Sequence, residues 1–133
     1  MPKIDTTALV RRAVADIWNR GDLAVADILF ASDYVNHNGL ITDLVRGPEA
    51  IKVSVALYRT AFPDLQISIG ALTVEKDTVL LRWAARSHMQ PGTLTGLLVC
   101  RVAGDQIAES WVQWDQGRAL ERIGLRPTGR AAG

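Results

Sequence analysis

The spacing of apolar residues changes once along this chain, at residues 62–64, Phe-Pro-Asp. Before this point apolar residues recur every three or four positions, which predicts amphipathic helices. After it, beginning with Leu65 and Ile67, they alternate with polar residues, which predicts strands. Proline favours such a change because it lacks a backbone donor and disfavours helical geometry in the residue before it. The chain is therefore expected to place its helices before its strands.

Three helices are expected in the first half of the chain. Asp5 or Thr6 can cap the first, and Asp22 can cap a shorter second helix. The third opens at 47–49, Gly-Pro-Glu, where proline suits the first helical position and glutamate suits the positive end of the helix dipole. The segment 32–47, between the second and third helices, is expected to be irregular.

Four antiparallel strands are expected after the helices, over residues 65–71, 78–88, 93–102 and 106–115. Helices followed by strands indicate an α+β fold, in which the helices cover one face of a curled antiparallel sheet. A chain of 133 residues fits one domain. We expect that domain to span residues 1–127, with a disordered tail at 128–133.

Composition argues against several classes of protein. The chain has 15 basic and 14 acidic residues, and a net charge of +1 does not favour nucleic-acid binding. Cys100 is the only cysteine, and no cluster of cysteine and histidine offers a metal site. No stretch approaches the roughly 20 apolar residues of a membrane span, and the first residues lack the apolar core of an export signal. A cytoplasmic protein without a metal or membrane partner is expected.

With its elements in this order, the chain resembles the SnoaL-like polyketide cyclases, which share the fold of nuclear transport factor 2 and limonene epoxide hydrolase. The resemblance covers nearly the whole chain. It is carried by the segments Gly47-Pro48-Glu49-Ala50-Ile51, Ala61-Phe62-Pro63-Asp64-Leu65, Asp77-Thr78-Val79 with Arg82-Trp83, and Gln106-Ile107-Ala108-Glu109-Ser110-Trp111 with Asp115, Leu120 and Ile123-Gly124-Leu125.

The resemblance implies a cone-shaped α+β roll with an apolar cavity and no cofactor, commonly a homodimer formed through the outer face of the sheet. It does not imply one reaction. Proteins of this fold include aldol cyclases, epoxide hydrolases, isomerases, dehydratases and members without known catalysis, so function has to be argued from the site.

Three positions depart from the cyclase pattern. The resemblance places the acid/base aspartate of the cyclases at Val112, three residues after the acidic position that Glu109 matches. It places their two pocket histidines at Ser110 and Leu98. Because valine cannot accept a proton, the aldol closure of the cyclases is expected to be absent or to use another group.

Three basic side chains are candidates for catalysis. His37 lies in a segment that in this fold often lines the cavity entrance, where an imidazole can transfer protons near neutral pH. The alternative is a histidine in a surface loop. Arg82 and His88 share one face of the second strand. Arg82 either faces solvent or a dimer interface, or enters the cavity to bind an oxyanion or carboxylate.

The last strand offers a candidate acid/base, Asp115. Alternation places Ser110, Val112 and Trp114 on one face, and the analogy with the cyclase aspartate makes this the cavity face. A bulge would reverse the alternation and bring Asp115 into the cavity, where burial beside tryptophans would raise its pKa. Otherwise Asp115 caps a terminal helix or forms a surface ion pair.

Two functions agree with these residues. The first is a cofactor-independent acid/base enzyme, a cyclase, isomerase or hydrolase, acting on a small hydrophobic oxygenated molecule. In it Asp115 or His37 transfers the proton, Arg82 stabilises negative charge and His88 is a further catalytic candidate. The alternative is a binding or assembly protein that has kept the cavity and lost catalysis. The side chains expected to contact the ligand are Trp83, Leu98, Trp111, Val112 and Trp114.

Overall fold

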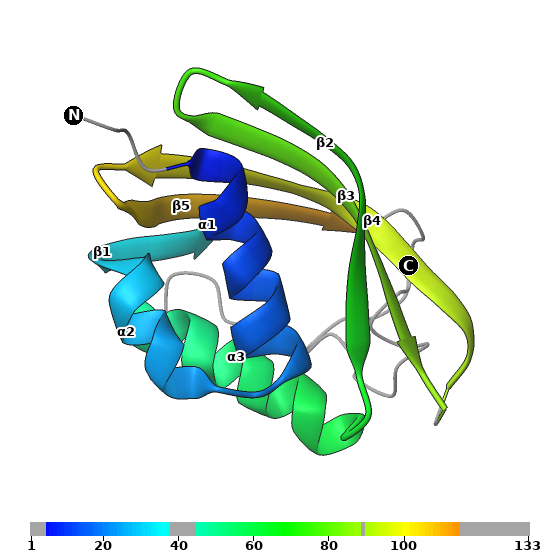
Figure 1. Ribbon diagram of the computed structural model, residues 1–133. Coiled ribbons are helices and arrows are strands. Elements are labelled where there is room, and N and C mark those ends of the chain that lie inside the picture. Colours follow the sequence, from blue (N-terminus) through cyan, green and yellow to red (C-terminus); the bar gives the residue numbers. More distant parts are fainter. Residues whose placement is uncertain (1–4, 38–44, 89, 115–133) are drawn as a thin grey trace, which may run out of the picture.

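A layer of helices covers one face of a curved five-stranded sheet in the computed structural model, which describes residues 5–37, 45–88 and 90–114 (Figure 1). The strand order is β1-β5-β4-β3-β2. Neighbouring strands are antiparallel except β1 and β5, which are parallel, so the sheet is mixed. The expected α+β architecture, with three helical segments against a curved sheet, is confirmed.

The first helical segment joins α1 (Thr6–Arg12) to a π-helical stretch, η1 (Ala13–Asn19). Of the two expected caps it is Asp5 that closes the first turn, since its carboxylate accepts hydrogen bonds from the backbone N–H groups of Thr7 at 3.0 Å and Ala8 at 3.4 Å. The second segment is short and consists of η2 (Leu23–Val25) and α2 (Ala26–Leu29).

The third helix, α3 (Pro48–Ala61), begins where the sequence predicts, with proline in its first turn. Gly47 precedes it with φ of 77° and donates its N–H to the carbonyl of Tyr34 at 2.8 Å. A Cβ atom at this position would meet the backbone oxygen of Ser32 at 2.5 Å. Glycine is therefore required here both by the backbone geometry and by the close approach of β1.

The strands are β1 (Phe30–His37), β2 (Gln66–Glu75), β3 (Thr78–Ser87), β4 (Gln90–Ala103) and β5 (Gln106–Trp114). The expectation of an irregular segment from residue 32 onward is wrong for 32–37, which belong to β1. Ser32 and Asp33 are adjacent exposed residues that break the apolar alternation. This strand is defined by its long-range pairing with β5, which local sequence does not reveal.

Arg59 and Asn19 fasten the helical layer to the edge of the sheet. The guanidinium of Arg59, on α3, donates to the carbonyls of Trp18 at 2.9 Å and Leu65 at 3.3 Å. It also donates to the carbonyl of Asn19 at 3.1 Å. The Asn19 side chain in turn bonds both backbone groups of Ile67 on the edge strand β2, at 2.6 and 2.9 Å. These contacts connect η1, α3 and β2 at one corner of the molecule.

Trp83 of β3 lies across Gly96, its register partner on β4. A Cβ atom at residue 96 would lie 2.5 Å from the indole ring of Trp83 and would also collide with the carbonyl oxygen of Gln113. Glycine in a strand interior commonly marks such a close approach, and an aromatic ring from the next strand covers it. The absence of a side chain at Gly96 thus allows the indole to lie flat on the sheet.

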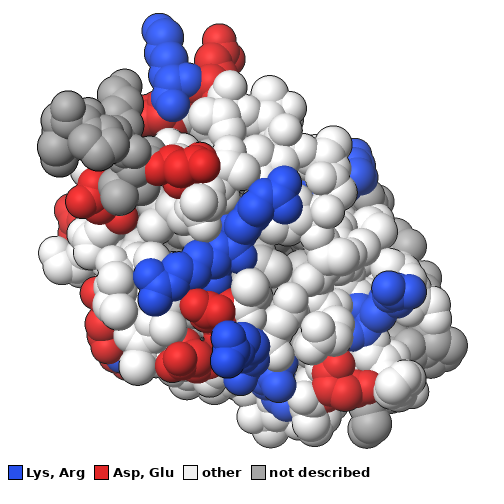
Figure 2. Space-filling model, in the orientation of Figure 1, with Lys and Arg blue, Asp and Glu red and all other residues white. Residues whose placement is uncertain are grey.

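None of the helices in the described parts of the chain is both long enough and apolar enough to cross a membrane. On the face seen in Figure 2, basic side chains lie close to acidic ones, and neither sign forms a broad continuous field.

The Gly96→Ala substitution is expected to destabilise the fold by at least about 2 kcal/mol, because the new methyl group overpacks against rigid backbone and the indole. Gly70→Ala is the matched control, since its Cβ would lie 3.5 Å from the carbonyl oxygen of Arg82, an ordinary contact distance. That change should stay within about 0.5 kcal/mol of the parent. Urea unfolding followed by circular dichroism measures both, and equal stability of the two variants would contradict the packing described.

Candidate functional site

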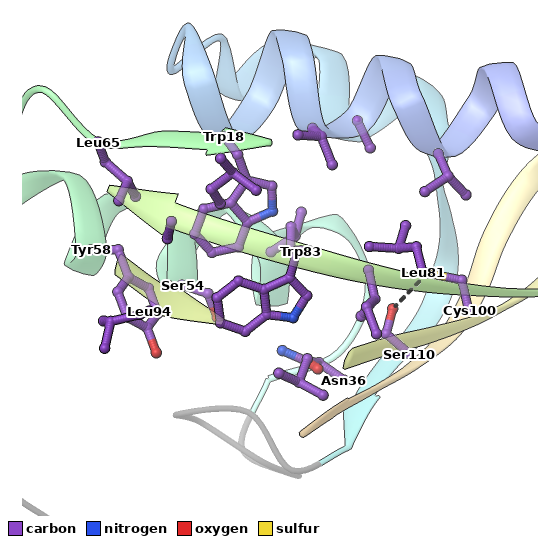
Figure 3. Close-up of a pocket in the computed structure, with 18 of the residues that line it drawn as sticks. Trp18, Asn36, Ser54, Tyr58, Leu65, Leu81, Trp83, Leu94, Cys100 and Ser110 are labelled. Atoms are coloured by element: carbon purple, nitrogen blue, oxygen red, sulfur yellow. Dashed lines mark hydrogen bonds between the residues drawn. The ribbon is translucent and has the colours of Figure 1, made fainter. Parts of the chain in front are cut away.

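A cavity of about 150 Å³ lies between the helices and the concave face of the sheet (Figure 3). Its walls come from α1, η1 and α3 on one side and from all five strands on the other. The lining residues are Val10, Ala13, Val14, Trp18, Phe30, Tyr34, Asn36, Ile51, Ser54, Tyr58, Phe62, Leu65, Ile67, Leu81, Trp83, Ala85, Arg86, Ser87, Gly92, Leu94, Leu98, Cys100, Ile107, Ser110 and Val112.

Aromatic rings form much of the wall. The rings of Trp18 and Tyr58 lie 5.7 Å apart, tilted by 56°, and the indole of Trp83 lies nearer the centre of the view in Figure 3. Burial raises the pKa of Tyr58, so its hydroxyl is neutral at physiological pH. Broad apolar surfaces of this kind suit a flat or compact apolar ligand.

A short row of neutral polar groups lies at the sheet end of the cavity. The Tyr34 hydroxyl donates to the Ser110 hydroxyl oxygen at 2.9 Å, and the Cys100 sulfur lies 3.8 Å from the same oxygen. Burial raises the pKa of Tyr34, and it raises the pKa of the Cys100 thiol to about 11. Both groups therefore remain protonated near pH 7, and Cys100 lacks the thiolate character of a nucleophile.

Asn36 lies beside this row, because β1 pairs with β5 so that Asn36 stands opposite Ser110. Its side chain reaches the cavity wall (Figure 3). The carboxamide oxygen is buried and has no hydrogen-bond partner within the described parts of the chain. Such orphaned polar atoms are rare in folded proteins and call for an explanation.

Three of the residues expected to contact a ligand, Trp83, Leu98 and Val112, line the cavity. Ser110 and Val112 both line it, as the alternation of β5 predicts. The three positions at which the resemblance places acid/base groups are therefore cavity positions, but they carry a hydroxyl and two aliphatic side chains.

Trp111 and His37 are placed differently from what was expected, because neither lines the cavity. Trp111 alternates with Ser110 and so lies on the outer face of the sheet, where the His37 ring stacks on it with centroids 5.0 Å apart and planes 11° apart. The His37 ring nitrogen Nε2 is 3.1 Å from Glu109, whose other oxygen accepts a hydrogen bond from Arg101 at 2.7 Å. His37 thus belongs to a polar cluster outside the cavity.

Arg82 and His88 also lie outside the cavity lining. Arg82 is exposed and pairs in register with Leu97, on the face opposite to Trp83. The His88 side chain is 99% exposed, and its Nδ1 lies 2.9 Å from Asp64. The three basic candidates therefore do not converge on one point. Asp115 and the side chain of Trp114 lie outside the described residues.

The groups that sequence reasoning missed are Tyr34, Asn36 and Tyr58. Tyr34 and Asn36 are two residues apart and share the inner face of β1. Their spacing indicates a shared face only if the segment is a strand, and no strand was expected there. Tyr58 lies in α3, where helical spacing alone predicts a core residue and gives no sign of a cavity.

The described lining contains no carboxylate and no imidazole, and its one charged group is Arg86. Nor do three or more metal-ligating side chains of the His, Cys, Asp or Glu type gather anywhere in the described ranges. The arrangement can enclose an apolar ring and offer it neutral hydrogen-bonding groups at one end.

A helical layer over a curved sheet, with an apolar cavity between them, defines the class of cone-shaped α+β proteins. Residues 8–123 match the family model described as SnoaL-like polyketide cyclase, and the chain belongs to this family. No curated protein sequence matches it.

Solved structures with the same fold include IdmH, a candidate polyketide cyclase from Streptomyces antibioticus, with 22% identity, a TM-score of 0.75, and coverage of 91% of this chain and 99% of that chain. Candidate polyketide cyclases from Acidithiobacillus ferrooxidans and Bacillus cereus are each 19% identical, with TM-scores of 0.75 and 0.76. They match 89% and 92% of this chain, and 93% and 82% of their own chains. At these identities the likeness concerns the fold.

The polar cluster of His37, Glu109 and Arg101 outside the cavity should make the stability of the fold depend on pH. The Arg101 guanidinium, followed by His37, holds the pKa of Glu109 below its usual value of 4.5. A lowered pKa in the folded state contributes stability above the unfolded pKa, and that contribution is lost as the pH falls through the folded value. Glu109→Gln should therefore cost up to about 1 kcal/mol at neutral pH, a small effect for a partly exposed ion pair, and almost nothing near about pH 2.

Urea unfolding at both pH values measures this difference, with Glu75→Gln, at the end of β2 on the far edge of the sheet, as the control. A cost of Glu109→Gln that is equal at the two pH values would show that the ionised carboxylate is not what stabilises this cluster.

Proposed function

We propose that this protein binds a compact, largely apolar, oxygenated molecule of about the size of one ring in its cavity. The observation that carries the proposal is a lining of aromatic and aliphatic side chains around about 150 Å³, with neutral polar groups at one end. An engineered apolar cavity of about this volume binds benzene. A ligand with several fused rings would have to extend beyond the enclosed space.

Binding is favoured over the reaction of the cyclases because of the groups at the cavity positions of β4 and β5. Val112 and Leu98 cannot exchange protons, and Ser110 is held in a hydrogen bond with Tyr34. Tyr34 and Cys100 keep their protons near pH 7, because burial raises both pKa values. General acid/base catalysis needs a group whose pKa lies near the working pH, and the described lining offers none.

Filling part of the cavity should weaken ligand binding. Leu98→Trp adds an indole to the wall and is expected to weaken the binding of p-cresol at least about tenfold, because the ligand and the new ring compete for the same space. Leu80→Trp is the control, since Leu80 is on β3 and 42% exposed. Isothermal titration calorimetry measures both, and a negative heat-capacity change is the expected sign of apolar burial. Equal affinities in the two variants would place the ligand elsewhere.

A second candidate function, an acid/base enzyme of the cyclase, isomerase or hydrolase type, is favoured by membership of the SnoaL-like polyketide cyclase family. Its proton-transferring group would be Asp115, which directly follows β5 in the sequence. In that case Asp115→Asn should lower turnover at least about 100-fold while leaving ligand affinity almost unchanged.

The assay would screen cyclic epoxides and β-keto esters by mass spectrometry, with Asp105→Asn, in the exposed turn between β4 and β5, as the control. Turnover that is lost only in the Asp115 variant supports catalysis. No turnover across the panel, or turnover that persists in Asp115→Asn, contradicts the assignment of this residue and leaves binding as the function.

A further inference from the structure

The mouth of the cavity carries the one charged side chain of its described lining, Arg86. Among the described lining residues only Arg86 and Gly92 are exposed. The lining at the other end, which includes Tyr34, Cys100 and Ser110, is buried. The cavity therefore opens to solvent between Arg86 on β3 and Gly92 on β4.

Arg86 lines the cavity at a point where β3 is irregular. Ala85, Arg86 and Ser87 are consecutive, yet all three line the cavity, whereas strict alternation would turn Arg86 to the outer face. The pairing of β3 with β4 shifts its register between Ala85 and Ser87. Irregularities of this kind re-aim side chains and are common beside functional sites. The irregularity thus brings a cation to an otherwise neutral lining.

The positive charge of Arg86 is not neutralised by the protein itself. Within the parts of the chain that the structure describes, Arg86 has no ion pair and no side-chain hydrogen bond. An acidic side chain, Asp64, lies at the same end of the molecule, but its carboxylate accepts hydrogen bonds from the Ser87 hydroxyl and from the His88 backbone N–H at 2.8 Å. The guanidinium of Arg86 is therefore available to an anion from outside the chain.

We propose that the ligand carries a carboxylate, which pairs with Arg86 at the cavity mouth while its single ring fills the apolar cavity. This rests on the proposed binding function and specifies the class of ligand, a small cyclic or aromatic carboxylic acid. The parallel donors of a guanidinium match the two oxygens of a carboxylate. A charge at the mouth stays partly hydrated, so its binding avoids the large cost of burying an ion among apolar side chains. Arg86 thus selects an anion over a neutral molecule.

Three ligands that share a 4-methylphenyl ring test the proposal with the unaltered protein. 4-Methylbenzoate is an anion at neutral pH, 4-methylbenzamide has almost the same shape without the charge, and 4-methylbenzylamine is a cation. In calorimetric titrations at low salt, 4-methylbenzoate is expected to bind at least about threefold more tightly than the amide, the modest gain of a partly exposed ion pair, and the amine is expected to bind most weakly. If the amide or the amine binds as tightly as 4-methylbenzoate, the proposal is overturned while cavity binding stands. If none of the three binds, and p-cresol does not bind either, the proposed function itself fails.

Arg86→Gln should abolish the preference for 4-methylbenzoate over the amide, because only the anion loses an ionic partner. Arg82→Gln is the matched control, since it removes the same charge from the same strand, but Arg82 is exposed on the face opposite to Trp83. The control should keep the preference. Arg86→Lys should keep part of it, since lysine retains the charge but lacks the planar fork. A preference that survives in Arg86→Gln, or that is lost equally in Arg82→Gln, would overturn the assignment of Arg86.

Salt gives an independent result. Screening weakens ion pairs near the surface, so the preference for 4-methylbenzoate should shrink as sodium chloride is raised from about 0.02 to about 0.5 M, while the affinity for uncharged p-cresol should not fall. A preference that does not change with salt would show that a contact other than the charge selects the carboxylate, and would contradict the proposal.

Discussion

The helices and the sheet each have one apolar face, and the fold depends on these two faces covering each other. Arg59 and Asn19 fasten the layers at the β2 edge by hydrogen bonds to backbone groups of η1 and the start of β2. Hydrogen bonds depend on direction, so these contacts fix where the helices lie on the sheet. The cavity lies between the helical layer and the concave face of the sheet (Figure 3).

The chemistry of the cavity follows from a few side chains on a scaffold that the family shares. At the cavity positions where the cyclases are expected to carry acid/base groups, this chain has Ser110, Val112 and Leu98. Burial raises the pKa of Tyr34, Tyr58 and Cys100, so these cavity groups are neutral near pH 7. Under the proposed binding function, the same fold would hold a ligand without the proton transfer of the cyclases, since function depends on the groups at the site.

The helices and the last four strands could be predicted because their signals are local: the spacing of apolar residues, the proline that opens α3 and the alternation along β5. The first strand, β1, could not be predicted, because it is defined by pairing with β5 some 70 residues later. This omission also misplaced His37, which shares a strand with Asn36 but points to the other face. The unpaired oxygen of Asn36 is likewise a property of the folded structure, which the sequence does not reveal.

Crystallography under xenon pressure can show whether the space beneath the helices is a dry apolar cavity, because xenon occupies such cavities and is easily located by its scattering. We expect a xenon atom between Trp83, Leu98 and Val112. Xenon found only on the outer face of the sheet, with ordered water filling the space beneath the helices, would contradict the assignment of an apolar ligand cavity.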